Sequence, residues 1–203
     1  MKRVLVTGGA GFIAHHIIDY ILKNTDWQIT ICDRLDFSGN MNRLHEIGAV
    51  PPRVRWIYHD LRAEFNPLLL KQIGEQDYIL HLAAGTHVDR SISDPMSFVY
   101  DNVVATGNML QMARQVGCEL FNYFSTDEVF GPAPGTTLYK EWDRYNSGNP
   151  YSATKAGGEE LALAFHNTYK VPVFITHTMN VIGERQHPEK FIPMVVKKVR
   201  DGE

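Results

Sequence analysis

Two adjacent carboxylates follow an apolar run near the middle of the chain, in the stretch FSTDEVFG. Thr126, Asp127 and Glu128 come directly after the apolar residues LFNYF, at the end of an expected strand. Such a pair is ordinary if its loop faces water. If the loop lines a pocket, like charges held close together push their two pKa values apart. One group then carries a proton while the other stays charged, so the stretch predicts either a solvated acidic loop or an acid paired with a base.

A tyrosine and a lysine stand four residues apart in YSATK, and Pro150 before them is typical of a helix start. At this spacing Tyr151 and Lys155 lie on one face of a helix. An ammonium close to a phenol favours the phenolate and lowers a pKa that starts at about 10. A tyrosine tuned in this way can take the proton from a hydroxyl group while hydride leaves its carbon. The alternative is that the pair lies on a solvated helix face.

A glycine-rich stretch, TGGAGFIA, lies between the first expected strand and the first expected helix. Gly8 and Gly11 permit a tight turn, Ala14 is small enough for helix and strand to pack, and the helix N-terminus attracts a pyrophosphate. Asp33 follows the second strand, where a carboxylate accepts hydrogen bonds from a ribose 2′-OH and repels a 2′-phosphate. The pattern predicts NAD as the cofactor, although the neighbouring Arg34 keeps NADP open. The alternative is a tight turn without a ligand.

Two further strand ends carry candidates for the same cofactor site. Asp60, after the third strand, could reach the adenine or could simply cap a helix. The small residues of HLAAGT, after the fourth strand, would let a flat cofactor lie across the strand ends, although they also suit a plain tight turn. The cofactor-binding residues expected from these stretches are Gly8, Gly11, Phe12, Ile13, Asp33, Arg34, Asp60, Leu61, Leu82, Ala83, Ala84 and Thr86.

The elements that must position these residues alternate along the chain. Strands are expected at Arg3–Thr7, Gln28–Cys32, Val54–Tyr58, Asp77–Leu82, Glu119–Ser125 and Val171–Thr178. Helices are expected at Gly11–Lys23, Pro95–Val116 and Tyr151–Tyr169, with a last helix in FIPMVVKKV and a long surface loop at Gly131–Pro150. The alternation predicts an α/β, doubly wound parallel sheet, the Rossmann fold. In such sheets ligands bind at the carboxyl ends of the strands.

The composition of the 203 residues excludes several other classes of protein. A hydrophobic content of 44% supports a folded core, and a net charge of −3 gives no sign of nucleic-acid binding. No apolar run is long enough to span a membrane. The two cysteines lie in apolar segments, which indicates free thiols and a cytoplasmic location. The nine histidines show no ligand spacing, so we expect no metal site.

Five segments taken together are similar to those of a known superfamily. TGGAGFIA, HLAAGTHVDRS, STDEVFG, PYSATKA and ERQHPEKFIP resemble the extended short-chain dehydrogenase/reductase superfamily, and within it the dTDP-glucose 4,6-dehydratase family. The Thr-Asp-Glu run is the narrower signal, because the glycine loop and the Tyr-x-x-x-Lys pattern identify only the superfamily. The resemblance implies an NAD-dependent sugar-nucleotide 4,6-dehydratase. Hydride would pass from C4 to NAD, water would leave across C5 and C6, and hydride would return to C6.

The resemblance also implies a role for each residue of the candidate active site. Tyr151 would be the base for the C4 hydroxyl, to which Thr126 would hydrogen-bond, and Lys155 would hold both the tyrosine and the cofactor ribose. Glu128 would take the C5 proton, and Asp127 would protonate the departing C6 oxygen. Tyr151 and Lys155 thereby join the cofactor site. The nucleotide-sugar substrate would contact Thr86, Thr126, Asn180, Lys190 and Phe191.

The same resemblance implies an organisation into two parts. Residues 1–180 would form the NAD-binding domain, and residues 181–203 would begin a substrate-binding region that continues in longer members of the family. A homodimer through the two long helices is expected. The alternatives are a sugar-nucleotide 4-epimerase or decarboxylase on the same scaffold, and a truncated NAD-binding module without catalytic activity.

Overall fold

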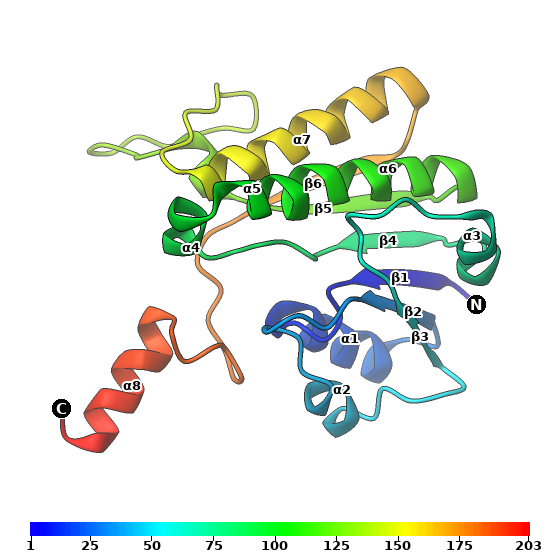
Figure 1. The fold of residues 1–203 in the computed structure, drawn as a ribbon, viewed down its shortest axis with the longest axis horizontal. Coiled ribbons are helices and arrows are strands. Elements are labelled where there is room, and N and C mark those ends of the chain that lie inside the picture. The colour runs from blue at the N-terminus through cyan, green and yellow to red at the C-terminus, as the bar shows by residue number, and fades with distance from the viewer.

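The computed structural model describes residues 1–203, and its centre is one sheet of six parallel strands (Figure 1). The strand order is β3-β2-β1-β4-β5-β6, which confirms the predicted doubly wound architecture. The strands are β1 (Arg3–Thr7), β2 (Gln28–Asp33), β3 (Val54–Tyr58), β4 (Tyr78–His81), β5 (Leu120–Thr126) and β6 (Val173–Thr178). All six expected strands are present, with boundaries shifted by at most a few residues.

Helices cover both faces of the sheet, as Figure 1 shows. The helices are α1 (Phe12–Asn24), α2 (Asn42–Glu46), α3 (Pro67–Ile73), α4 (Val88–Ser93), α5 (Pro95–Phe98), α6 (Ala105–Val116), α7 (Pro150–Tyr169) and α8 (Phe191–Asp201). Neighbouring side chains of β1 explain the two layers: Val4 and Val6 pack in the cluster with α1, whereas Leu5 packs in the cluster with α6. Strands buried on both faces are apolar throughout, which is why RVLVT does not alternate with polar residues.

The long helix expected at Pro95–Val116 is helical throughout but not uniform. Between α5 and α6 the chain forms a π-helical stretch, Val99–Val104. Asn102 in this stretch is buried and binds both backbone groups of Gly85, with its Oδ1 2.8 Å from the amide nitrogen and its Nδ2 3.0 Å from the carbonyl oxygen. The Asn102 Nδ2 also donates to the Thr154 hydroxyl at 2.9 Å. The π-helical stretch therefore fixes the loop after β4 against α7.

Three short helices, α2, α3 and α4, were not expected from the sequence. Their five to seven residues are too few to show a helical period. Several strand boundaries also differ from the expected ones by one or two residues, and two of these differences have a local reason. Pro172 has no N–H group to continue the ladder, so β6 begins at Val173, and the Asp77 side chain accepts hydrogen bonds from Lys2 and Arg3 immediately before β4. The loop between Gly131 and the start of α7 contains neither helix nor strand, as expected.

A buried histidine joins β1, β4 and α6 through a chain of hydrogen bonds. The Thr106 hydroxyl donates to the Asn102 carbonyl at 2.6 Å, so it can only accept from the His81 Nε2–H, which lies 3.1 Å away. The His81 Nδ1 therefore accepts from the Thr7 hydroxyl at 2.8 Å, and that hydroxyl accepts the Ala83 N–H. His81 is neutral, and burial lowers its pKa to about 3.

This pKa predicts acid sensitivity. The folded state favours the neutral ring. Its contribution to the free energy of unfolding is therefore complete above pH 6.5 and falls between pH 6.5 and 3, by at most about 1.4 kcal/mol per pH unit. The free energy of unfolding, measured with urea at several pH values, should fall with pH in this range in the wild type. In His81→Gln the slope should be smaller, because one fewer proton is taken up on unfolding. The exposed control His45→Gln should keep the wild-type slope. An unchanged slope in His81→Gln would contradict the assignment.

Candidate functional site

The glycine loop after β1 packs closely on the end of β4. Gly8 has a φ of +66°, and a Cβ built there would lie 2.9 Å from the Ala83 Cα, so no larger residue fits. The Gly8 N–H donates to the Cys32 carbonyl at 2.9 Å, and the Gly11 N–H donates to the Gly8 carbonyl at 2.8 Å. The loop is thus a tight turn that brings the first turn of α1 to the carboxyl ends of the central strands.

The N-terminus of α1 is open toward this edge of the sheet. Gly11 is its N-cap residue, and no side chain caps the helix. The amide groups of Phe12 and Ile13 have no intrahelical acceptor, and no acidic residue lies in the first turn of the helix. Uncapped amides beside a glycine turn fit the pyrophosphate of a dinucleotide.

Asp33 ends β2 beside the glycine loop, where its carboxylate is held by two backbone amides. Its Oδ2 accepts the Ala10 N–H at 3.0 Å, and its Oδ1 accepts the Leu35 N–H at 2.8 Å. The second lone pair of each oxygen stays available. This geometry brings together the glycine loop and the acidic residue that the sequence predicted for one site, in the arrangement suited to a ribose diol.

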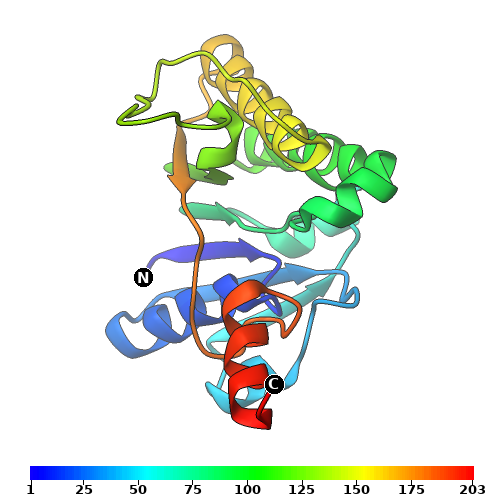
Figure 2. The ribbon, with the colours of Figure 1, turned by 90° about the vertical axis from the view of Figure 1, so that its left-hand side faces the viewer.

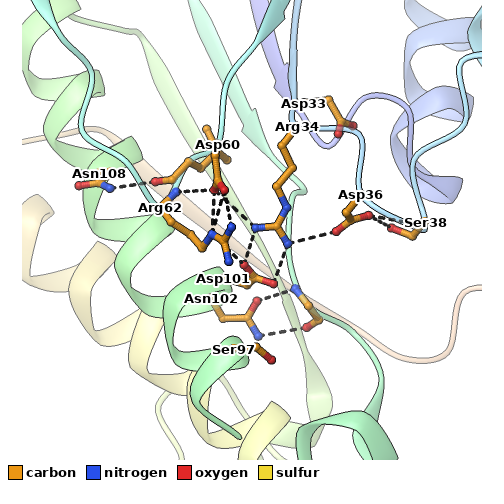
Figure 3. A network of polar contacts seen from close by, with 12 residues as sticks. Asp33, Arg34, Asp36, Ser38, Asp60, Arg62, Ser97, Asp101, Asn102 and Asn108 are labelled. Carbon is orange, nitrogen blue, oxygen red and sulfur yellow. Dashed lines mark hydrogen bonds and ion pairs between the residues drawn. The ribbon is translucent and has the colours of Figure 1, made fainter. Parts of the chain in front are cut away.

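The two neighbouring candidates, Arg34 and Asp60, belong to an ion-pair cluster (Figure 3). Asp60 caps no helix, since α3 is capped by Asn66. It accepts the Arg62 backbone N–H at 3.0 Å and pairs with the Arg62 guanidinium, and this hydrogen bonding lowers the pKa of Asp60 to about 2. Arg34 binds Asp101, which the sequence did not single out.

Tyr151 and Lys155 lie in the first two turns of α7, but their electrostatics differ from the prediction. Burial, reinforced by the negative charge of Glu128, raises the pKa of Tyr151 to about 12, whereas the sequence predicted a lower value. Lys155 is buried, and its Nζ donates to the Phe124 carbonyl at 2.7 Å. Burial lowers the pKa of Lys155 to about 7. The loss of hydration and the nearby carboxylates outweigh the expected effect of the lysine on the phenol.

The paired carboxylates lie at the end of β5, in the short 3₁₀ helix Asp127–Phe130. Both are half-buried, and the Thr126 hydroxyl donates to the Asp127 Oδ1 at 3.3 Å and accepts the backbone N–H of Glu128 at 3.3 Å. The Asn149 Nδ2 donates to the Glu128 Oε2 at 3.2 Å. After burial, which is the main cause, the negative charges of both carboxylates raise the pKa of Tyr151, so both lie within electrostatic range of the phenol. This arrangement favours the pocket over the solvated loop.

A third carboxylate, which the sequence analysis missed, lies fully buried behind the tyrosine and lysine. Glu159 accepts a short hydrogen bond from the Ser125 hydroxyl, and its Oε2 lies 2.5 Å from the Tyr145 hydroxyl and 2.8 Å from the His177 Nε2. The available signal was its spacing, one helical turn after Lys155 on the same face. Glu159 ties the ends of β5 and β6 to α7.

We expect Glu159→Ala to lower the free energy of unfolding by about 3–5 kcal/mol, because it leaves buried donors without an acceptor. The adjacent Glu160 is exposed, so Glu160→Ala is the matched control. Urea unfolding of both variants at neutral pH measures the difference. Equal stability of the two variants would show that the buried carboxylate is not a structural tie.

The last part of the chain returns across the strand ends and brings one predicted pair together. The Lys190 Nζ donates to the Thr86 carbonyl at 3.2 Å, and the Arg90 guanidinium lies 3.1 Å from the Glu189 Oε2. Asn180 and Phe191 are exposed and do not join this contact. Figures 1 and 2 show α8 away from the layer of α6 and α7.

No group of three or more histidine, cysteine, aspartate or glutamate side chains is arranged to hold a metal ion. Cys32 and Cys118 are free thiols. None of the helices combines the length and the apolar character that crossing a bilayer requires.

The fold and the site define a dinucleotide-binding protein of the short-chain dehydrogenase/reductase type, and comparison with known proteins gives the family. The NAD-dependent epimerase/dehydratase family matches residues 4–203. The chain belongs to this family.

Individual relatives include both dehydratases and epimerases of nucleotide sugars. The dTDP-glucose 4,6-dehydratase of Neisseria meningitidis serogroup B is 36% identical over 214 residues, which cover 100% of this chain and 59% of that protein. The crystal structure of the dTDP-glucose 4,6-dehydratase of Streptomyces venezuelae with NAD bound superposes with a TM-score of 0.91 at 37% identity, covering 99% of this chain and 63% of that one. A UDP-N-acetylglucosamine 4-epimerase from Methanobrevibacter ruminantium gives a TM-score of 0.88 at 30% identity, covering 100% and 64%. The chain thus spans about three fifths of the length of these relatives.

Proposed function

We propose that this chain binds NAD and catalyses the 4,6-dehydration of a nucleotide sugar, with dTDP-glucose as the first candidate substrate. The observation that carries the proposal is the pair Asp127 and Glu128, half-buried at the end of β5, where Asp127 accepts a hydrogen bond from Thr126 and Glu128 accepts one from Asn149. Elimination of water needs one group to accept a proton and another to donate one, and two close carboxylates in a closed site divide these tasks. The 36–37% identity to dTDP-glucose 4,6-dehydratases supports the same activity.

The cofactor site is proposed to run along the carboxyl ends of β1, β2 and β4. Gly8, Gly11 and the amides of Phe12 and Ile13 would hold the pyrophosphate, and Asp33 would hold the adenosine ribose. NAD supplies the hydride acceptor at the start of the reaction and the hydride donor at its end. Residues 1–180 would form this cofactor domain, and residues 181–203 would begin the substrate-binding region.

The first proton transfer is assigned to Tyr151. As a phenolate it would take the proton of the C4 hydroxyl while Thr126 accepts or donates a hydrogen bond at the same oxygen. The pKa of Tyr151, about 12 in this structure, makes the phenolate scarce at neutral pH. A positive charge close to the phenol favours its ionised form, and Lys155 as well as the oxidised cofactor could supply one.

The elimination step is assigned to the carboxylates. Oxidation at C4 makes the C5 proton acidic, and Glu128 would remove it. Asp127 would donate a proton to the C6 oxygen, so that the C6–O bond breaks and water leaves. The proton count of the elimination balances, since Glu128 gains a proton and Asp127 loses one, and Glu128 would return its proton to C5 when hydride adds to C6.

The proposal extends to the partner, the assembly and the location of the protein. The nucleotide sugar is the small-molecule partner, and a homodimer through α6 and α7 would follow the resemblance to the superfamily. Two unpaired thiols fit a reducing compartment, so we propose the cytoplasm.

A second candidate is a 4-epimerase of nucleotide sugars, which the structural likeness to a UDP-N-acetylglucosamine 4-epimerase favours. An epimerase would use Tyr151 and NAD in the same way but would have no step for the paired carboxylates. Its product has the mass of its substrate, whereas a dehydratase product is lighter by one water.

The test is incubation of the 203-residue chain with NAD and, in separate reactions, dTDP-, UDP-, GDP- and CDP-glucose, followed by mass spectrometry. Loss of one water with formation of a 4-keto-6-deoxy sugar supports the dehydratase. An unchanged mass with inversion at C4 supports the epimerase. NAD binding without any turnover supports a cofactor-binding module and contradicts both enzymes.

A further inference from the structure

Two guanidinium groups and three carboxylates form a cluster between the ends of β2 and β3 and the π-helical stretch (Figure 3). The Arg34 guanidinium forms a bidentate ion pair with Asp101, in which Nη1 donates to Oδ1 at 2.7 Å and Nη2 donates to Oδ2 at 2.9 Å. Asp36 lies 3.1 Å from Nη2, and Asp60 lies 3.5 Å from Nη1. Arg62 pairs with Asp60. Both Nη atoms of Arg34 are thus already engaged by carboxylates.

The position of Arg34 makes this arrangement important for cofactor choice. In dinucleotide-binding folds an arginine near the ribose-binding acid accommodates the 2′-phosphate of NADP. Arg34 directly follows Asp33, so the sequence alone left NADP open. To bind a 2′-phosphate, the guanidinium would have to break its bidentate ion pair with Asp101, which is a strong contact of fixed geometry.

Among the three carboxylates that contact Arg34, Asp101 makes the shortest contacts. Its side chain is 16% exposed, compared with 36% for Asp36 and 33% for Asp60. Asp60 is shared with Arg62, and Asp36 also accepts hydrogen bonds from Ser38. Asp101 is held in place by its neighbour Asn102, which binds the backbone of Gly85 on both sides.

From this geometry we infer that Asp101 is a specificity-determining residue: it holds Arg34 away from the ribose 2′ position and so makes the site select the dinucleotide without a 2′-phosphate. The net negative charge around the site adds to this selection, because it repels a 2′-phosphate. This charge comes from four carboxylates against two guanidinium groups, namely Asp33, Asp36, Asp60 and Asp101 against Arg34 and Arg62. The inference rests on the proposed binding of NAD, but not on the dehydratase chemistry.

The test measures direct binding of NAD and NADP to the full chain, by calorimetry and without turnover. Asp101→Asn should lower the dissociation constant for NADP about 10-fold, the size of one charge-assisted contact, while the constant for NAD changes less than about 3-fold. Asp26→Asn, an exposed change of the same charge before the amino end of β2, is the control and should alter neither constant. Adding Arg34→Ala to Asp101→Asn should remove the gain for NADP.

Three outcomes would overturn the inference. They are an unchanged NADP-to-NAD ratio in Asp101→Asn, a gain that survives Arg34→Ala, and an equal gain in Asp26→Asn. Asp101→Thr, a smaller neutral replacement, carries the same expectation and takes the place of Asp101→Asn if that variant does not fold. If the wild type binds neither dinucleotide, the proposed function fails together with the inference. If it binds NAD and the ratio stays unchanged, only the inference fails.

Discussion

Glu128→Gln is expected to slow water elimination by about 10²- to 10⁴-fold, the usual contribution of a positioned general base. The first half of the reaction should survive, because Tyr151 and Lys155 are untouched and the amide can still accept the hydrogen bond from Asn149. Hydride would therefore reach the cofactor and stay there. In a single turnover with stoichiometric NAD, the absorbance of the reduced nicotinamide should accumulate in the variant. In the wild type it should rise only transiently.

Variants of the two carboxylates distinguish a dehydratase from an epimerase. Asp127→Asn should also block elimination, since it removes the proton donor for the C6 oxygen. Glu141→Gln, an exposed change in the loop before α7, is the control and should behave as the wild type. Turnover within about threefold of the wild type in both Glu128→Gln and Asp127→Asn would contradict the assignment of the carboxylates, given the size expected for such groups.

Tyr151→Phe is expected to lower the rate of both half-reactions by about 10²- to 10⁴-fold, because the group that exchanges a proton with the C4 oxygen is lost. The pH dependence follows from the same residue. The active form is the phenolate, so the rate of hydride transfer should rise with pH below the pKa of Tyr151, which is raised to about 12 in this structure. A bound cation lowers that value and shifts the rise toward neutral pH.

The measurement for this variant is the rate of cofactor reduction across a pH series, together with NAD binding by calorimetry. Binding should be retained, because the phenylalanine ring fills the same space. Tyr20→Phe, at an exposed position on α1, is the control. Cofactor reduction by Tyr151→Phe at the wild-type rate would show that another group is the base.

Much of the fold could be predicted because the decisive signals are local. The apolar run RVLVT, the glycines after it and Asp33 after the next strand lie within one βαβ unit, so their positions in space follow from their order in the chain. The pair Asp127 and Glu128 was equally visible, because the end of a parallel strand is where such sheets bind ligands. The short helices α2 to α4 left no comparable pattern.

The features that the sequence did not reveal depend on residues far apart in the chain. Arg34 and Asp101 are 67 positions apart, and only the assembled sheet brings the π-helical stretch to the end of β2. Glu159 meets Ser125 and His177 for the same reason. The pKa of Tyr151 was predicted in the wrong direction, since helical spacing gives the distance to Lys155 but not the burial that dominates.

The most direct test of the central claim follows one deuterium atom. The chain is incubated with NAD and dTDP-glucose that carries deuterium at C4, and the product is analysed by NMR. The proposed reaction moves hydride from C4 to the cofactor and then to C6 of the same sugar, so the product should be a 4-keto-6-deoxy sugar with deuterium in its C6 methyl group. A sugar that keeps its C6 oxygen and carries the deuterium at an inverted C4 would contradict the dehydratase and establish an epimerase.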